Sequence, residues 1–264
     1  MLRHQRLAAM VELIAGQRSL RVDDVVAAFD VSAATARRDL DELADQQLVM
    51  RTRGGAIAHT VSYDLPLRYK SGRQPEQKRR IAAAAAAALI CPGSVIGING
   101  GTTNTLIARG IATRADLARP DTTGPAALTI VTNALNIANE LAVRPQLKIV
   151  VIGGVVRPQS FELIGPFAAG VLTGLALDVM VLGVNGISPE GGAAANHEGE
   201  AEINSIMVDR SATVIAVADS SKIGLRAFCA ICPATRVDIL ITDTDADRSE
   251  IRAFEQLGVD VRLV

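Results

Sequence analysis

The chain has 264 residues, 49% of them apolar, and a net charge of -1, which fits one large domain or two smaller ones and excludes disorder over its whole length. The apolar run Ile81–Cys91 ends at Pro92 and is too short to span a bilayer. The charged N-terminus lacks the pattern of a signal peptide. Three cysteines make no disulfide framework, and the absence of tryptophan disfavours binding of single-stranded nucleic acid by base stacking. We therefore expect a cytoplasmic protein with no membrane contact.

Charge is distributed unevenly along the chain. Residues 1–80 hold fourteen basic and ten acidic side chains, a balance of +4, whereas residues 81–264 hold thirteen and eighteen, a balance of -5. A basic front and an acidic rear indicate a module that binds a polyanion, joined to a module of another kind.

Residues 1–58 have the pattern of a winged helix-turn-helix. Apolar residues at helical spacing predict a helix from Leu2 to Ile14, a second short helix after Asp23, and a third helix that Ser32 caps and whose buried face includes Leu40 and Leu43. Residues 48–57 then predict two short strands that meet around two glycines.

The third helix has the position from which a recognition helix reads the major groove of double-stranded DNA. Arginines on this helix and on the hairpin suit bases and phosphates. A small helical interaction domain with solvated arginines is the less favoured alternative. The residues we expect to contact DNA are Ser32, Thr35, Arg37, Arg38, Arg51 and Arg53.

Residues 59–77 are rich in proline, glycine and charge, have little periodicity, and are expected to form a linker. The third segment, residues 78–264, begins with an alanine run at 82–88 that predicts a buried helix. Short apolar runs then alternate with helical patterns, which predicts an α/β domain with a parallel sheet. The expected strands are Ser94–Ile98, Leu128–Val131, Leu147–Ile152, Asp178–Gly183, Thr213–Ala218, Val237–Ile241 and Val259–Leu263.

Polar residues and glycines follow these strands. Because the carboxyl ends of parallel strands share one edge, where ligands bind, we expect these residues to converge on one crevice. The run from Asn99 to Thr103, with two glycines before hydroxyls at a helix start, suits a phosphate, and Lys222 can neutralise it. A tight turn in which Thr102 caps the helix, and a solvated loop lysine, are the plain alternatives.

Two further motifs have competing interpretations. His197 and Glu200, at the start of a predicted helix, are either polar contacts to a ligand or helix-capping residues, and one histidine with scattered glutamates is a weak metal signal. Cys229 and Cys232 have the spacing of a redox or zinc pair, but a second pair is missing, so we favour small core-facing cysteines.

The sequence resembles DeoR-type bacterial transcriptional regulators along nearly its whole length. The resemblance rests on Val31-Ser32 through Leu40, on Arg51-Thr-Arg-Gly-Gly-Ala56, and in the rear half on short motifs: Gly100-Gly-Thr-Thr103, Val131-Thr-Asn133, Gly153-Gly154, Glu200-Ala201 and Asp219-Ser-Ser-Lys222. The chain departs from the family pattern at Ala36, Gln47 and Arg53, where the family usually has isoleucine, glycine and histidine.

The resemblance implies a rear domain similar in fold to ribose-5-phosphate isomerase that binds a phosphorylated sugar as effector and assembles a homo-oligomer, a dimer or a tetramer. The resemblance implies phosphate at Gly101, Thr102, Thr103 and Lys222, and it implies the sugar near Asn133, Asn185, His197 and Glu200. The implied effector-binding residues are Asn99, Gly100, Gly101, Thr102, Thr103, Asn133, Gly153, Gly154, Asn185, His197, Glu200 and Lys222.

These observations together predict a DNA-binding transcriptional regulator, a repressor of carbohydrate-metabolism genes, with no cofactor, metal or catalytic residue. The rival is a sugar-phosphate isomerase or deaminase with an appended interaction module. Related isomerases carry acidic groups where this chain has Asn185, and an asparagine cannot act as a general base. The sequence therefore favours the regulator.

Overall fold

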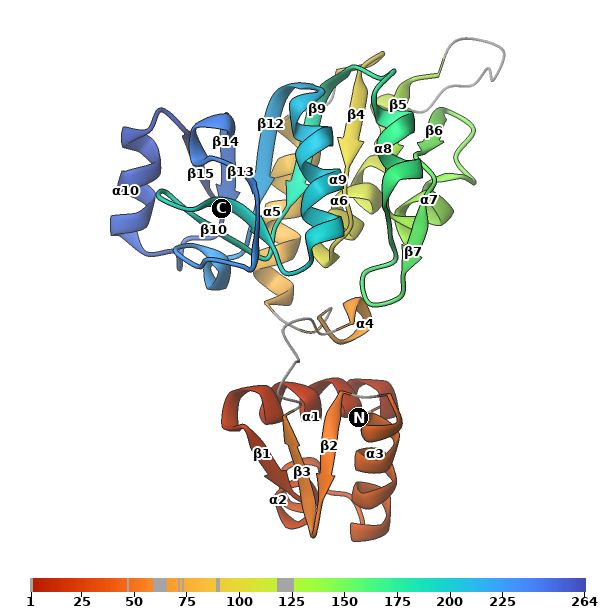
Figure 1. Cartoon of the computed structure of the whole chain (residues 1–264), viewed down its shortest axis with the longest axis vertical. Helices are drawn as coiled ribbons and strands as arrows, with labels where there is room; N and C mark the ends of the chain where they lie inside the picture. The colour runs from red at the N-terminus through yellow and green to blue at the C-terminus, as the bar shows by residue number, and fades with distance from the viewer. Residues whose placement is uncertain are drawn as a thin grey trace. The chain divides into compact units, whose positions relative to one another are not determined.

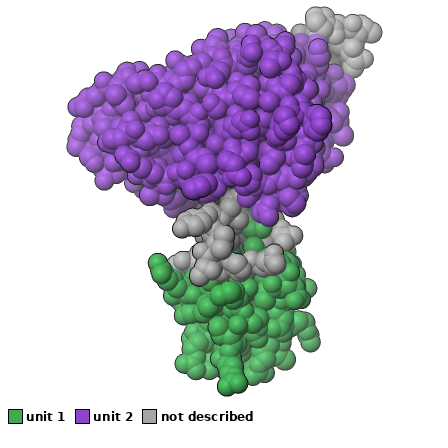
Figure 2. Space-filling model, in the orientation of Figure 1, with its two compact units in different colours: residues 1–73 green, residues 74–264 purple. Residues whose placement is uncertain are grey.

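The computed structural model describes residues 2–46, 48–58, 66–70, 72, 74–88, 91–117 and 126–264. It divides into two compact units, Met1–Arg73 and Gln74–Val264 (Figure 2). Two helices begin inside the expected linker of residues 59–77: α4 (Leu67–Lys70) and α5 (Pro75–Ala88). Proline suits the first position of a helix because its fixed φ is already helical, so Pro75 starts α5 instead of breaking it. Residues 59–65, 71 and 73 of that linker, and Gln47, lie outside the described residues.

The first unit is a winged helix-turn-helix. Its elements are α1 (Arg3–Gln17), β1 (Ser19–Arg21), α2 (Val22–Phe29), α3 (Ala33–Asp45), β2 (Val49–Thr52) and β3 (Gly55–Ala58). The core includes Met10, Ile14, Leu40 and Leu43, each no more than 1% exposed, which confirms the buried face predicted for α3. Strand β1 was not predicted, because three residues are too few to establish an alternating pattern, and it is held by pairing with β3.

The second unit is built on a parallel sheet of seven strands, in the order β15-β14-β12-β9-β4-β5-β6 (Figure 1). These are the seven predicted strands, shifted by at most two residues at either end. Their bounds are β4 (Val95–Ile98), β5 (Leu128–Thr132), β6 (Leu147–Val151), β9 (Leu177–Gly183), β12 (Ser211–Val217), β14 (Ile239–Thr242) and β15 (Asp260–Leu263). From β4 the chain adds strands outward to β6, and from β9 it adds them in the opposite direction. The order therefore reverses between β4 and β9, and we call the carboxyl ends of these two strands the switch point.

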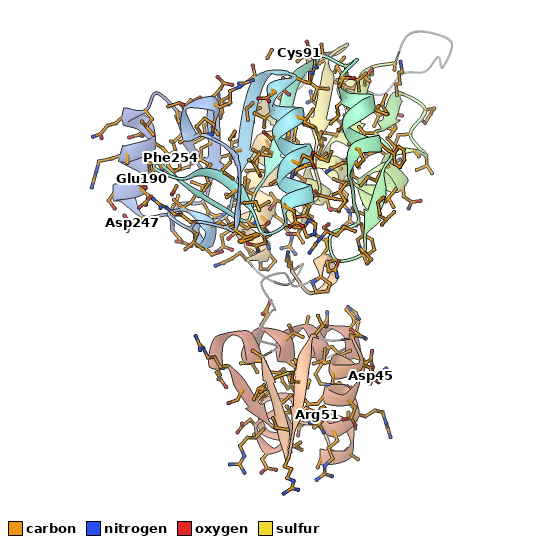
Figure 3. All side chains as sticks on the ribbon, in the orientation of Figure 1. Asp45, Arg51, Cys91, Glu190, Asp247 and Phe254 are labelled. Atoms are coloured by element: carbon orange, nitrogen blue, oxygen red, sulfur yellow. The ribbon has the colours of Figure 1, made fainter. Side chains whose placement is uncertain are left out.

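Helices cover both faces of the sheet. One face packs against α5, α6 (Thr102–Ala112) and α7 (Leu135–Leu141), in a core that contains Ile81 and Ile107. The other packs against α8 (Pro166–Leu172), α9 (Glu198–Asp209) and α10 (Arg248–Gln256), in a core that contains the fully buried Phe254 (Figure 3). The alanine run lies in α5, where Ala82 and Ala85 are buried, as predicted. No described helix is long and apolar enough to cross a membrane.

The second unit also contains short antiparallel strands, which were not predicted. Strands β7 (Val155–Arg157) and β8 (Glu162–Ile164) form a hairpin, and β10 (Gly186–Ser188), β11 (Gly192–Ala195) and β13 (Cys229–Cys232) form a small sheet. Three 3₁₀ turns complete the unit: η1 (Ala115–Leu117), η2 (Ser220–Lys222) and η3 (Ala234–Arg236).

The two cysteines of β13 are free thiols that contact the core formed between the sheet and α8, α9 and α10. Cys232 is buried and Cys229 is half-buried, so the expectation of a core-facing pair is confirmed fully for the first and partly for the second. Burial raises the pKa of Cys232 to about 11, because the thiolate would lose its hydration. A reactive thiolate would need the opposite shift.

Candidate functional site

Ser32 fixes the start of α3. Its Oγ accepts a hydrogen bond from the Thr35 backbone N–H at 3.2 Å and lies 3.0 Å from the Thr35 hydroxyl oxygen. Ser32 is therefore the N-cap of α3, as predicted. The hydroxyl groups of Ser32 and Thr35 contact each other at the start of the helix. Arg37 and Arg38, in the second turn, are exposed.

The two hairpin arginines differ in their surroundings. Arg53 is exposed in the turn between β2 and β3. Arg51, labelled in Figure 3, donates from Nε to Asp41 Oδ1 of α3 at 2.6 Å and from Nη1 to the Gly55 carbonyl. Arg51 therefore ties the wing to α3 and does not project freely from the hairpin.

A buried carboxylate, for which the sequence pattern suggested no role, joins α3 to α1. Asp39 is 1% exposed, and its Oδ2 accepts from Arg6 Nε at 2.7 Å while its Oδ1 lies 3.4 Å from Arg3 Nε. Asp39, which follows the exposed Arg37 and Arg38, thus faces the interior and joins the buried side of α3 to α1. Helical spacing alone could have indicated this, because position 39 shares a face with Ala36 and Leu43.

In the second unit, Asn99 joins the two strands of the switch point. Its Oδ1 accepts from the Gly183 N–H at 2.7 Å, and its Nδ2 donates to the Gly183 carbonyl at 3.0 Å. The Asn104 side chain in turn donates to the Asn99 carbonyl at 2.9 Å. The start of the loop after β4 is therefore hydrogen-bonded to the last residue of β9 at the carboxyl edge of the sheet.

Glycine is required at both positions of the loop after β4, for a different reason at each. An ideal Cβ on Gly100 would lie 2.3 Å from Glu162 Oε1, so only glycine allows that carboxylate to approach. Gly101 has a φ of 123° and occupies the N-cap position of α6. Thr102 is consequently the first residue of the helix, and the alternative in which it caps the helix is wrong. The amides of the first turn of a helix have no partner within the helix and suit an anion.

Glu162, on β8, was not predicted as a site residue. It is 4% exposed, and its Oε2 accepts from Asn133 Nδ2 at 3.0 Å. The Asn133 Oδ1 is buried and has no hydrogen-bond partner among the described residues. Beside them, Arg157 of β7 donates to Glu200 Oε1 at 3.0 Å, with both side chains nearly buried. Buried acceptors therefore gather beside the glycine-threonine loop.

Lys222 lies on the loop after β12. Its Nζ donates to the Val184 carbonyl, next to Gly183, at 2.6 Å, so this lysine is not a freely solvated loop residue. Asp219 and Asp243 at the neighbouring strand ends are buried, and Asp243 Oδ2 accepts from the Ser220 N–H at 2.7 Å. Lys222 is thus next to the switch point. Its loop begins at the buried Asp219 and is hydrogen-bonded to the buried Asp243.

The remaining predicted residues have visible structural tasks. His197 is the N-cap of α9, where its Nδ1 accepts from the Gly199 N–H at 3.1 Å, as in the capping alternative. Asn185 Oδ1 accepts from the Asn196 N–H at 3.0 Å and braces the β10–β11 hairpin. Gly153 and Gly154, with φ of 73° and 115°, turn the chain from β6 into β7. Within the described part of the chain, no cluster of acids, histidines and cysteines could hold a metal ion.

The first unit thus presents arginines from a capped helix and a wing, and the second gathers helix amides, a lysine and buried acceptors at one edge of a parallel sheet. These features define a DNA-binding regulator with a separate sensing unit.

Comparison with known proteins agrees with this class. Residues 6–61 match the DeoR-like helix-turn-helix domain, and residues 73–244 match the DeoR C terminal sensor domain. The chain is 32% identical to the glycerol-3-phosphate regulon repressor of Escherichia coli (strain K12), over 98% of both chains. It is 29% identical to the HTH-type transcriptional repressor GlcR of Bacillus subtilis (strain 168), over 99% of this chain and 96% of that one.

Among solved structures, the full-length sorbitol operon regulator SorC from Klebsiella pneumoniae matches 96% of this chain and 99% of its own, with 12% identity and a TM-score of 0.44. Ribose 5-phosphate isomerase A from Methanocaldococcus jannaschii matches 56% of this chain and 54% of its own, with 16% identity and a TM-score of 0.39.

The chain belongs to the DeoR family of transcriptional regulators, and it is a DNA-binding protein of that class. The curated relatives above, which it matches along nearly their whole length, are named as repressors and not as enzymes.

Proposed function

We propose that the protein represses carbohydrate-metabolism genes in the cytoplasm, as a homo-oligomer that responds to a phosphorylated sugar bound at the switch point. The repressor names of the full-length relatives support the sign of regulation, and one of those names includes a phosphorylated polyol. The observation that carries the effector site is that Asn99, after β4, and Lys222, after β12, are hydrogen-bonded to adjacent residues at the end of β9, Gly183 and Val184.

On the DNA side, Arg37 and Arg38 are the base-reading candidates because they are exposed on α3, with Ser32 and Thr35 at its start. Arg53 at the tip of the wing suits an adjacent phosphate or the minor groove. We give Arg51 a positioning role, since Asp41 and the Gly55 carbonyl already hold its guanidinium.

For the effector, the amides of Gly101, Thr102 and Thr103 supply the donors that a phosphate needs, and Lys222 supplies the charge. The sugar would lie over the buried acceptors. Glu162 and Asn133 Oδ1 suit hydroxyl groups, because a hydroxyl can donate to a carboxylate or to an amide oxygen. A second phosphate there would meet negative charge. The arrangement therefore favours one phosphate at one end of a polyol.

The rival enzyme is less well supported. Asn185 cannot act as a general base, and the Glu200 carboxylate is already paired with Arg157 at 3.0 Å. We assign no catalytic residue, cofactor or metal to the chain.

The test is Lys222→Met, with Lys148→Met on the exposed surface of β6 as the matched control. Charged hydrogen bonds contribute about 1.5–3 kcal/mol, so Lys222→Met should weaken sugar-phosphate binding by roughly one to two orders of magnitude. Calorimetry with a panel of sugar and polyol phosphates and their unphosphorylated counterparts measures the affinity. An operator selected from random DNA with the wild-type protein allows gel shifts to measure the response.

Without effector, both variants should bind that operator like the wild type. A Lys222→Met protein that binds and responds like Lys148→Met would remove the lysine from the site. A wild-type protein that no phosphorylated compound affects would remove the site itself.

A further inference from the structure

One stretch of the second unit forms a surface almost without charge. Residues 149–177 cover the end of β6, the β7–β8 hairpin and α8, and 23 of these 29 residues are at least partly exposed. At the 21% charged composition of the chain, about six of the 29 would be charged, but only Arg157 and Glu162 are. Both face inward, Arg157 to Glu200 and Glu162 to Asn133. The outer surface of this stretch therefore has no exposed charged side chain.

Large apolar side chains take the place of the missing charges. Of thirteen such side chains exposed in the described part of the chain, six lie between residues 151 and 171. Phe167 is 77% exposed and Val155 is 60% exposed. We call these six residues the valine–phenylalanine face: Val151, Val155, Val156, Phe161, Phe167 and Val171.

The elements of this face adjoin one another at the β6 end of the sheet (Figure 1). An ideal Cβ on Gly154 would lie 3.0 Å from the Ala168 Cβ, so the start of the hairpin packs directly on α8. Phe167 and Val171 are one helical turn apart on α8 and share a side of it. Val151 ends β6, whose outer edge has no paired strand among the described residues. An apolar patch of this kind on a water-facing surface marks an interaction site.

We propose that the valine–phenylalanine face is the surface through which two copies of this chain associate about a two-fold axis. Residues that lie close to such an axis meet their own counterparts, so a charge there would meet a like charge, and a face without charge avoids that repulsion. The same lack of charge gives a foreign partner no electrostatic complementarity to select it. The stretch has 23 residues that are at least partly exposed, enough to supply the roughly 20–30 residues a side of a stable interface.

Association with a second copy of the chain also agrees with the DNA-binding role of the first unit. A helix-turn-helix dimer binds two half-sites related by a two-fold axis, so a second copy provides the second recognition helix. The inference rests on the homo-oligomer of the proposed function and adds the face that forms it. It does not depend on which effector the protein binds.

The test measures the mass of the full-length protein by sedimentation equilibrium over a range of micromolar concentrations. Phe167→Asp places a charge at the most exposed side chain of the face, and burial of that charge against a second copy would remove its hydration. We expect the wild type to be a dimer or a multiple of one, and Phe167→Asp to have half the wild-type mass, with the dimer dissociation constant raised at least 100-fold. Phe167 is exposed, so the thermal unfolding of the variant should match that of the wild type.

Phe228→Asp is the matched control, because Phe228 is also a phenylalanine, is 79% exposed, and lies outside the face, just before β13. This control should keep the wild-type mass. A monomeric wild type would overturn both the homo-oligomer and its interface. A wild-type oligomer that Phe167→Asp leaves intact, or that Phe228→Asp alone dissociates, would overturn the face and leave the oligomer standing.

Discussion

The Asp39→Ala substitution tests how the recognition helix is held in place. Asp39 is 1% exposed and accepts from Arg6 at 2.7 Å, while Arg3 lies farther away at 3.4 Å and is half exposed. Removing one member of a buried ion pair costs about 3–5 kcal/mol, because the other charge stays buried without a partner. The Arg6 side chain keeps 12% exposure and can regain some water, so we expect the lower end, about 3 kcal/mol, for the first unit.

For a unit of this size, each kcal/mol lowers the melting temperature by roughly 4–8 °C, so a loss of about 3 kcal/mol should lower it by about 12–24 °C. Scanning calorimetry of the full chain should show the transition of the first unit moving down while that of the second stays in place. The control is Asp41→Ala on the same helix, whose side chain is 60% exposed and pairs with Arg51. An exposed pair contributes about 1 kcal/mol or less. Equal melting of the two variants would refute the bracing role of Asp39.

Three further predictions concern other parts of the chain. Arg37→Ala or Arg38→Ala should weaken operator binding by about 1–3 kcal/mol at fixed salt without unfolding the helix, and gel shifts that show no change in either variant would exclude α3 from base reading. At pH 8, iodoacetamide should modify the exposed Cys91 (Figure 3) and spare Cys232, whose pKa of about 11 keeps it a thiol; peptide mass spectrometry should show Cys232 reacting only as the pH approaches 11. Gly100→Ala would place a methyl group 2.3 Å from the Glu162 carboxylate and so displace it. Calorimetry should then show at least tenfold weaker effector binding, while operator binding is retained.

The large elements could be predicted from sequence because their signals are local. Each of the seven parallel strands is an apolar run bounded by turn residues, and the helices of the first unit have clear apolar spacing. The short antiparallel strands have no such signal. The β11 sequence, Gly192–Ala195, has neither β-branched residues nor alternation, and its strand geometry comes from pairing with β10 and β13.

The same reasoning explains what the sequence revealed of the candidate site. Glycines and hydroxyls after strands mark the carboxyl edge, so the loops after β4, β9 and β12 were placed correctly along the chain. Glu162 and Arg157 lie on an unpredicted hairpin, and nothing local indicates that their side chains turn inward. The cap formed by His197 depends on where α9 begins, and helix boundaries are the least certain part of a sequence prediction.

The side chain of Asn99 has a consequence for how a signal could leave the second unit. Its amide presents an N–H donor and a carbonyl acceptor side by side, as a peptide unit does, and each is hydrogen-bonded to Gly183 across the switch point. The side chain thus adds two hydrogen bonds between the ends of β4 and β9, where the two halves of the sheet meet. A platform that is stiff before any ligand arrives needs no binding energy to organise it. We therefore expect a change of shape in this unit to involve the peripheral loops and the β7–β8 hairpin more than the join between β4 and β9.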